Sequence, residues 1–190
     1  MKIKDYLFKR LHVRPEIVDE LLSLGHPFFM KEGQRLLQKG EVSNRVYFIE
    51  RGIVREYEGL IGNPKKDDED TTWILGAGEW IYNVESYQTG EPSEVYIQAL
   101  TTTSGMYFDR NDLDGLVQKS HEWSLIQNKI YRRYFVRQER RNKLHRTKDG
   151  QERLDLFYEQ HPELNGQVKL KYIASYLNMT QSQLSRIRAR

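Results

Sequence analysis

The sequence predicts an α+β chain, with an antiparallel sandwich or barrel of short strands in its first 110 residues and helices in the remainder. Short runs rich in β-branched and aromatic residues recur between glycine turns up to about residue 110. A helical period then takes over from Asn111. The charge changes at the same place: residues 1–110 carry 14 Lys and Arg against 18 Asp and Glu, whereas residues 111–190 carry 16 against 9. The net charge of +3 therefore divides into −4 and +7, which indicates two modules with different partners.

The composition excludes several kinds of chemistry. With 190 residues, of which 38% are hydrophobic, the chain can bury a core. It has no cysteine, so disulfides, thiolate catalysis and iron–sulfur clusters are excluded. No histidine lies between Pro27 and Ser120, so we expect no metal site, no haem and no catalytic site in the strand region. No apolar run approaches the ~20 residues of a membrane span, and the start lacks a signal peptide. We expect a cytoplasmic protein without a membrane partner.

The strand region is expected to open with a helix over residues 14–24, with Pro15 in its first turn. The polar stretch 59–70 is predicted to be a loop. The strands are predicted at residues 28–30, 35–38, 46–50, 53–58, 71–75, 94–99 and 105–108.

One long amphipathic helix is predicted over residues 111–148. Its apolar side chains recur at spacings of 7, 3, 4 and 4: Leu116, Trp123, Ile126, Ile130 and Tyr134. This face is too apolar to remain in water, and two alternatives are open: it packs against a second copy of the chain or against the strand region. The basic run between Arg132 and Lys148 is either a solvated helix face or a contact to nucleic acid.

Two short helices are predicted at the C-terminus, after a break at residues 149–150 and a helix over 151–160. The first covers 171–177 and ends in a tight turn at Asn178 and Met179, and Asn is one of the few residues that accepts a left-handed conformation. Thr180 caps the second helix, with Gln183 completing a capping box.

The second of these helices has distinct inner and outer faces. Leu184 and Ile187, three residues apart, are expected to face inward, and the last 23 residues carry five basic residues and no acid. These features favour a helix-turn-helix, in which the second helix enters the major groove; an ordinary helical hairpin is the alternative. The expected base contacts are Gln181, Ser182, Ser185 and Arg186. The expected phosphate contacts are Lys169, Lys171, Thr180, Arg188 and Arg190.

Over nearly its full length the chain resembles the Crp/Fnr superfamily of bacterial transcription regulators. The resemblance rests on KEGQRLLQKGEVSNRVYFIERGIVREY, TGEPSEVYIQAL and YIASYLNMTQSQLSRIR. It implies a cyclic-nucleotide-binding-like antiparallel β-roll (1–110), a dimerisation helix (111–148) bearing the apolar face above, and a helix-turn-helix domain (149–190). It also implies a homodimer on double-stranded DNA with a two-fold symmetric site, and RNA polymerase as a further partner. The wing that follows the recognition helix in many relatives is expected to be absent.

The expected effector pocket departs from the family. The resemblance puts Asn83 where relatives that bind cyclic nucleotides have the glutamate that holds the ribose, after Tyr82 in place of glycine. Ser93 replaces the arginine that neutralises the phosphate, and Glu94 follows it. We therefore expect weak or no binding of cyclic nucleotides. The degenerate pocket is predicted to comprise Trp80, Tyr82, Asn83, Ser93, Glu94 and Tyr96.

Two other functions remain as alternatives. An enzyme is disfavoured because no Gly-Lys-Ser/Thr loop, Gly-x-Ser-x-Gly elbow or His-Glu-x-x-His motif is present. A sensory or interaction module without specific DNA binding is the alternative to a DNA-binding regulator.

Overall fold

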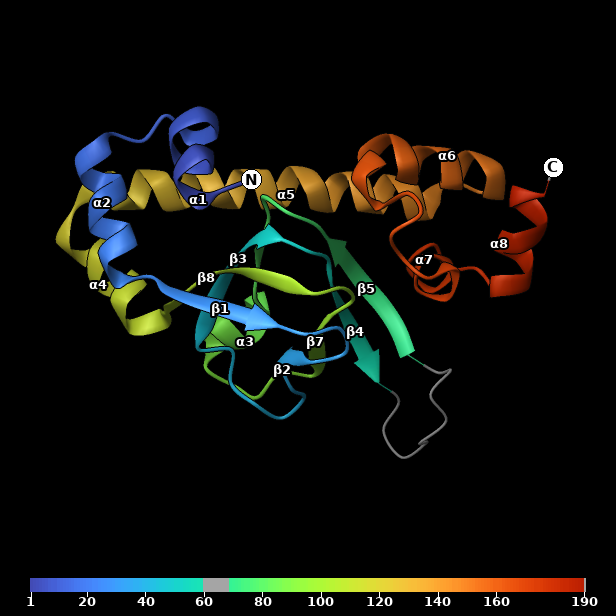
Figure 1. Cartoon of the computed structure of the whole chain (residues 1–190), viewed down its shortest axis with the longest axis horizontal. Helices are drawn as coiled ribbons and strands as arrows, with labels where there is room; N and C mark the ends of the chain where they lie inside the picture. Colours follow the sequence, from blue (N-terminus) through green and yellow to red (C-terminus); the bar gives the residue numbers. More distant parts are fainter. Residues whose placement is uncertain (60–68, 190) are drawn as a thin grey trace.

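Two four-stranded antiparallel sheets form a roll beneath one long helix in the computed structural model, which describes residues 1–59 and 69–189 (Figure 1). The first sheet has the strand order β1-β8-β3-β6 and the second β2-β7-β4-β5. The strands are β1 (His26–Met30), β2 (Arg35–Leu37), β3 (Arg45–Arg51), β4 (Val54–Gly59), β5 (Glu69–Leu75), β6 (Trp80–Ile81), β7 (Val95–Ala99) and β8 (Thr103–Asp109).

The seven predicted strands are confirmed, and each begins and ends within two residues of its predicted bounds. The eighth, β6, has only two residues, too few for an alternating pattern to reveal it. The predicted loop over 59–70 lies mostly outside the described residues, and its ends are strand: Gly59 closes β4, and Glu69 opens β5.

Gly52 makes the turn between β3 and β4 possible. Its φ of 91° is one that residues with a side chain rarely adopt. A Cβ there would lie 2.6 Å from the Thr102 carbonyl oxygen, so the turn also needs the space that glycine leaves.

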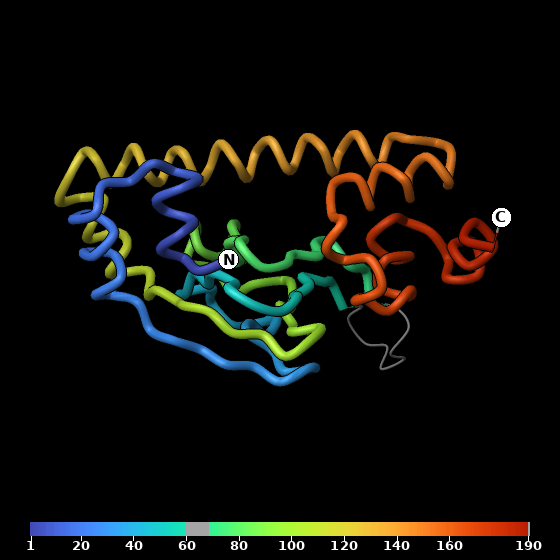
Figure 2. The backbone as a smooth tube through the Cα atoms, turned by 45° about the horizontal axis from the view of Figure 1, so that its top comes forward, coloured from blue at the N-terminus to red at the C-terminus, as the bar shows by residue number. Residues whose placement is uncertain are grey.

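Helices lie at both ends of the roll and along its length. The helix α5 extends across the molecule, with the N-terminal helices at one end and α6–α8 at the other (Figures 1 and 2). Within residues 1–59 and 69–189, no helix is both long enough and apolar enough to cross a membrane. The helices are α1 (Ile3–Asp5), a π-helical turn (Tyr6–Arg10), α2 (Pro15–Leu24), α3 (Val84–Thr89), α4 (Arg110–Lys119), α5 (His121–Arg146), α6 (Gly150–Gln160), a 3₁₀ turn (Pro162–Leu164), α7 (Leu170–Tyr176) and α8 (Gln181–Arg188).

The single helix predicted over 111–148 is wrong in one respect, because two helices occupy this range. Ser120 separates α4 from α5 with extended backbone (φ −149°, ψ 132°), and its hydroxyl accepts a hydrogen bond from the Glu122 amide. The apolar period continues across the break because Leu116 and Trp123 enter the same buried cluster.

The apolar face of α4 and α5 packs within one chain, which corrects its assignment to a dimer interface. Leu116, Trp123 and Ile126 are buried with the N-terminal helices and with Phe48 of the roll, and Ile130 packs against the same cluster. Tyr134 lies further along α5, with its ring 5.9 Å from that of Trp73 in β5. The alternative in which the face covers the strand region is therefore the one observed.

Candidate functional site

The C-terminal helix pair, α7 and α8, is joined by the predicted tight turn. Asn178 has a φ of 53°, in the left-handed region, as expected of the residue at this position. The Met179 amide donates to the Ala174 carbonyl oxygen at 2.9 Å, which closes the end of α7. The side-chain Nδ2 of Asn178 also lies 3.2 Å from Nδ1 of His145, so the turn contacts the end of α5.

The predicted capping box begins α8. The Thr180 hydroxyl accepts from the Gln183 amide at 3.2 Å, and the Gln183 side chain accepts from the Thr180 amide at 2.8 Å. Leu184 is fully buried, and Ile187 packs against the same cluster. These contacts fix which side of α8 faces the protein.

The opposite side of α8 is exposed. The four predicted base-contact residues are all in water: Gln181, Ser182, Ser185 and Arg186. Thr180 and Arg188 are exposed beside them, and Arg190 lies outside the described residues. The front of α8 is thus a polar, basic surface near the first turn of a capped helix.

The two predicted phosphate contacts at the start of α7 have partners within the chain. Lys169 forms an exposed ion pair with Glu32 of the roll, with 2.8 Å between Nζ and Oε1. Lys171 is half-buried, with its Nζ 5.0 Å from the centre of the Tyr172 ring.

Contacts that the sequence pattern did not reveal hold α7 on the roll. The Ser175 hydroxyl accepts from the Thr71 amide at 2.8 Å and donates to the Glu69 carbonyl oxygen at 3.0 Å, which joins α7 to β5. Arg55 is buried between the Tyr57 and Tyr172 rings, at 3.9 and 4.1 Å from their centres. In the sequence, the sign of the Arg55 contact is a charged residue, Arg55, within the predicted strand 53–58.

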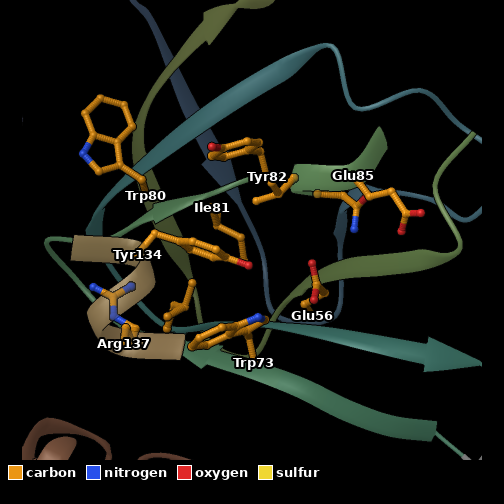
Figure 3. A pocket seen from close by; sticks show the side chains of 11 residues that line it. Glu56, Trp73, Trp80, Ile81, Tyr82, Glu85, Tyr134 and Arg137 are labelled. Atoms are coloured by element: carbon orange, nitrogen blue, oxygen red, sulfur yellow. The ribbon is translucent and has the colours of Figure 1, made fainter. Parts of the chain in front are cut away.

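A cavity of about 360 Å³ lies between the roll and α5 (Figure 3). Of the predicted effector residues it contains Trp80, Tyr82 and Asn83. Burial raises the pKa of the Tyr82 phenol, which therefore stays uncharged. The other lining residues, which the sequence did not identify, are Glu56, Trp73, Leu75, Ile81, Val84, Glu85, Tyr134 and Arg137.

The remaining predicted effector residues lie outside this cavity. Ser93 is buried, and its hydroxyl hydrogen-bonds with the backbone of Val95. Glu94 is exposed and pairs with Lys39 at 2.7 Å. Tyr96 stacks on Tyr57. Tyr87 lines a separate, small apolar hollow behind Tyr82, which has a volume of about 80 Å³.

Two acidic side chains, Glu56 in the cavity lining and Glu79 outside it, differ in their partners. Glu56 of β4 is 9% exposed, and its Oε1 accepts from the Thr72 hydroxyl at 2.7 Å. Burial raises the pKa of this carboxyl, and hydrogen bonds from Thr72 and Asn83 oppose the rise. Glu79, which follows Gly78, forms an ion pair with Arg137 of α5 and is not part of the cavity lining.

Comparison with protein families decides the nature of the roll. Residues 27–120 match the model of the cyclic nucleotide-binding domain. These residues belong to that domain family. Comparison with curated protein sequences finds no match.

Several solved structures resemble this chain over most of its length, including the helices that follow the roll. FixK2 from Bradyrhizobium japonicum has 16% identity and a TM-score of 0.73, over 87% of this chain and 83% of its own. CooA from Carboxydothermus hydrogenoformans, a mutant, has 19% identity and a TM-score of 0.68, over 100% and 83%. CLP, a c-di-GMP-responsive global regulator from Xanthomonas campestris, has 16% identity and a TM-score of 0.70, over 93% of this chain and 90% of its own. The chain therefore has the fold of Crp/Fnr family regulators.

Proposed function

We propose that this chain is a DNA-binding transcription regulator of the Crp/Fnr type, in which α7 and α8 form a helix-turn-helix. The observation that carries the proposal is the exposed front of α8, where Gln181, Ser182, Ser185 and Arg186 are held outward by a capping box and by the buried Leu184. The first residues of a recognition helix are those that reach base edges in the major groove.

The side chains on this front have the chemistry for reading bases. Gln181 can pair with adenine through two hydrogen bonds, and Arg186 can do the same with guanine. Ser182 and Ser185 can donate to or accept from either kind of base. Arg188 continues the positive charge toward the C-terminus, where it can contact phosphates.

Dimerisation is part of the proposal, through the outer face of α5. This face exposes Leu125 (49%), Phe135 (64%) and Val136 (54%), which are large apolar side chains on the side away from the roll. Leu125 and Val136 are three turns apart on one line of the helix. Joining two copies here would cover these side chains and would present two α8 helices. A two-fold symmetric DNA site, whose half-sites are about 34 Å apart, requires two such helices.

A sensory module that does not bind specific DNA is the second candidate. It is favoured by the contacts of α7 with the roll, because Lys169 is paired with Glu32 and Ser175 is bonded to β5. In this candidate the helix pair serves as a structural cap on the roll.

A regulator, and not an enzyme, is what we propose. Among residues 1–59 and 69–189, no group of three or more His, Asp or Glu side chains is placed to hold a metal ion. RNA polymerase is a further proposed partner, because a regulator of this type either recruits the polymerase to a promoter or blocks its access.

A gel-shift assay at two or more salt concentrations, with DNA selected from a random pool, tests the proposal. We expect enrichment of a palindrome and a steep loss of affinity as salt rises, because phosphate contacts release counterions. No retardation at low salt would reject DNA binding and favour the sensory module.

A further inference from the structure

The cavity beneath α5 has walls suited to a flat ring. Aromatic side chains from three parts of the chain line it: Trp73 from β5, Tyr82 from the residue after β6, and Tyr134 from α5. The Trp80 ring points away from this space and packs against Phe48 and Phe108 (Figure 3). Figure 3 shows the Tyr82, Tyr134 and Trp73 rings on one side of the open space and the Glu56 and Glu85 carboxylates on the other. The volume of about 360 Å³ lies near the lower end of the ~300–1,000 Å³ usual for small-molecule sites, which suits one or two fused rings.

The polar anchor in this cavity is an acceptor. Glu56 is almost completely buried; the Thr72 hydroxyl donates to its Oε1, and the Asn83 side chain also hydrogen-bonds the carboxyl. A carboxyl group removed from water needs further donors, and an N–H group on a ligand would supply one. Glu85 stands exposed at the rim and adds a second negative charge.

Of the cations near the cavity, Arg137 and Lys39 are ion-paired, whereas the buried Nε of Arg141 has no hydrogen-bond partner among the described residues. Arg137, the one Lys or Arg among the described lining residues, is paired with Glu79. Arg141 lies against the Trp73 ring, 5.3 Å from its centre, and opposes the rise that burial causes in the pKa of Glu56, without lining the cavity. Lys39 is paired with Glu94 outside it. An anion would enter a site with two carboxylates and no free cation in the described part of the lining.

We propose that this cavity binds a planar aromatic compound that bears an N–H donor and is neutral or positively charged, and that it excludes anions. The rings stack between Trp73, Tyr82 and Tyr134, and the donor reaches Glu56. This binding does not require DNA binding, so either one can fail while the other stands.

Three indole compounds that differ in the charge of their side chain test this binding: tryptamine (positive), indole (neutral) and indole-3-propionate (negative). Calorimetric titration of the full chain should give a dissociation constant for tryptamine at least about ten-fold lower than for indole-3-propionate, since a hydrogen bond to a charged group is worth about that much. In nitrogen-edited NMR spectra, the indole N–H signal of Trp73 should shift, whereas that of Trp123, which lines only the separate apolar hollow, should not.

Glu56→Gln should reduce the preference for tryptamine over indole-3-propionate, and Glu94→Gln, at an exposed carboxylate outside the cavity, should leave it unchanged. The charge series in the unaltered chain decides the question if Glu56→Gln does not fold. The proposal is overturned if none of the three compounds binds at millimolar concentration, if the anion binds best, if Trp123 shifts in place of Trp73, or if cyclic AMP binds more tightly than tryptamine.

Discussion

Single residues decide how the C-terminal helix pair meets its surroundings. Asn178 takes the left-handed conformation that lets α7 end and α8 begin within a few residues. Thr180 and Gln183 then satisfy each other's backbone donors, so α8 starts at a defined residue. As a consequence the front of α8 is fixed, and the role of each exposed side chain on it can be tested singly.

Arg186→Ala should weaken binding to the preferred DNA site by about 1–3 kcal/mol and relax selection at one base position, because a base-edge contact is lost. Lys171→Ala should weaken binding to all sequences alike and reduce the salt dependence, because a phosphate contact carries no sequence information. Gel shifts with the selected and a scrambled duplex measure both effects. Unchanged site selection by Arg186→Ala would mean that this residue does not reach the bases.

Glu56→Gln should stabilise the chain at neutral pH and lose this advantage as the pH falls toward 4.5. Burial raises the pKa of Glu56 above the usual 4.5, so the folded chain binds more protons than the unfolded chain in the interval between the two values. Stability therefore falls as the pH rises through that interval, and glutamine removes the effect while keeping an acceptor for Thr72. Urea unfolding at pH 4.5 and pH 7.5 checks this; an equal difference at both would contradict it.

The helices α7 and α5 each have one side that is buried in the fold and another that makes a contact of proposed functional or structural importance. In α7 one side is buried in the helical core through Ile173 and Ala174, while Ser175 reaches the edge strand β5. In α5 one side covers the roll and the cavity, and the other exposes Phe135 and Val136. Each helix therefore connects two parts of the molecule.

Ser175→Ala should lower the free energy of unfolding by about 1–3 kcal/mol, because the buried Thr71 amide loses its acceptor. Ser185→Ala, on the exposed front of α8, is the matched control and should change stability by less than about 0.5 kcal/mol. Thermal or denaturant unfolding measures both. Equal stability of the two variants would show that the α7–β5 contact contributes little.

At the scale of the whole molecule, α5 joins the N-terminal helices, the cavity and the C-terminal helix pair (Figure 2). Tyr134 and Arg137 line the cavity from this helix, and His145 at its end touches the turn before α8. The exposed outer face of the same helix is the proposed dimer interface. A ligand and a second copy would thus contact α5 directly, and DNA bound at α8 would be connected to it through the His145–Asn178 contact.

Phe135→Glu should convert a dimer into monomers, because a charge would have to be buried without a partner at the interface. It should also weaken DNA binding, since one helix pair would engage one half-site. Sedimentation equilibrium measures the mass, with Gln118→Glu on the exposed side of α4 as the control for added charge. A monomeric unaltered chain, or a dimeric Phe135→Glu variant, would contradict this interface.

The sequence predicted the local features well and the distant contacts poorly. The capping box and the strands depend on residues close together in the chain, so a short pattern contains the information. The assignment of Leu116, Trp123 and Ile126 failed because periodicity shows that a face is buried but not what covers it. The sequence did not predict the cavity lining formed by Glu56, Trp73 and Arg137, because these residues lie on two strands and a helix up to 81 residues apart in the chain.

By itself, the sequence determined the division into a strand region and a basic helical region, and the pair of short helices joined by a tight turn over residues 171–187. Only the tertiary structure decided which side of α5 is free, which residues line the cavity and that a buried carboxyl group stands within it. The physical reason is that local backbone preferences act over a few residues. Burial and charge pairing, in contrast, depend on where distant segments come to lie.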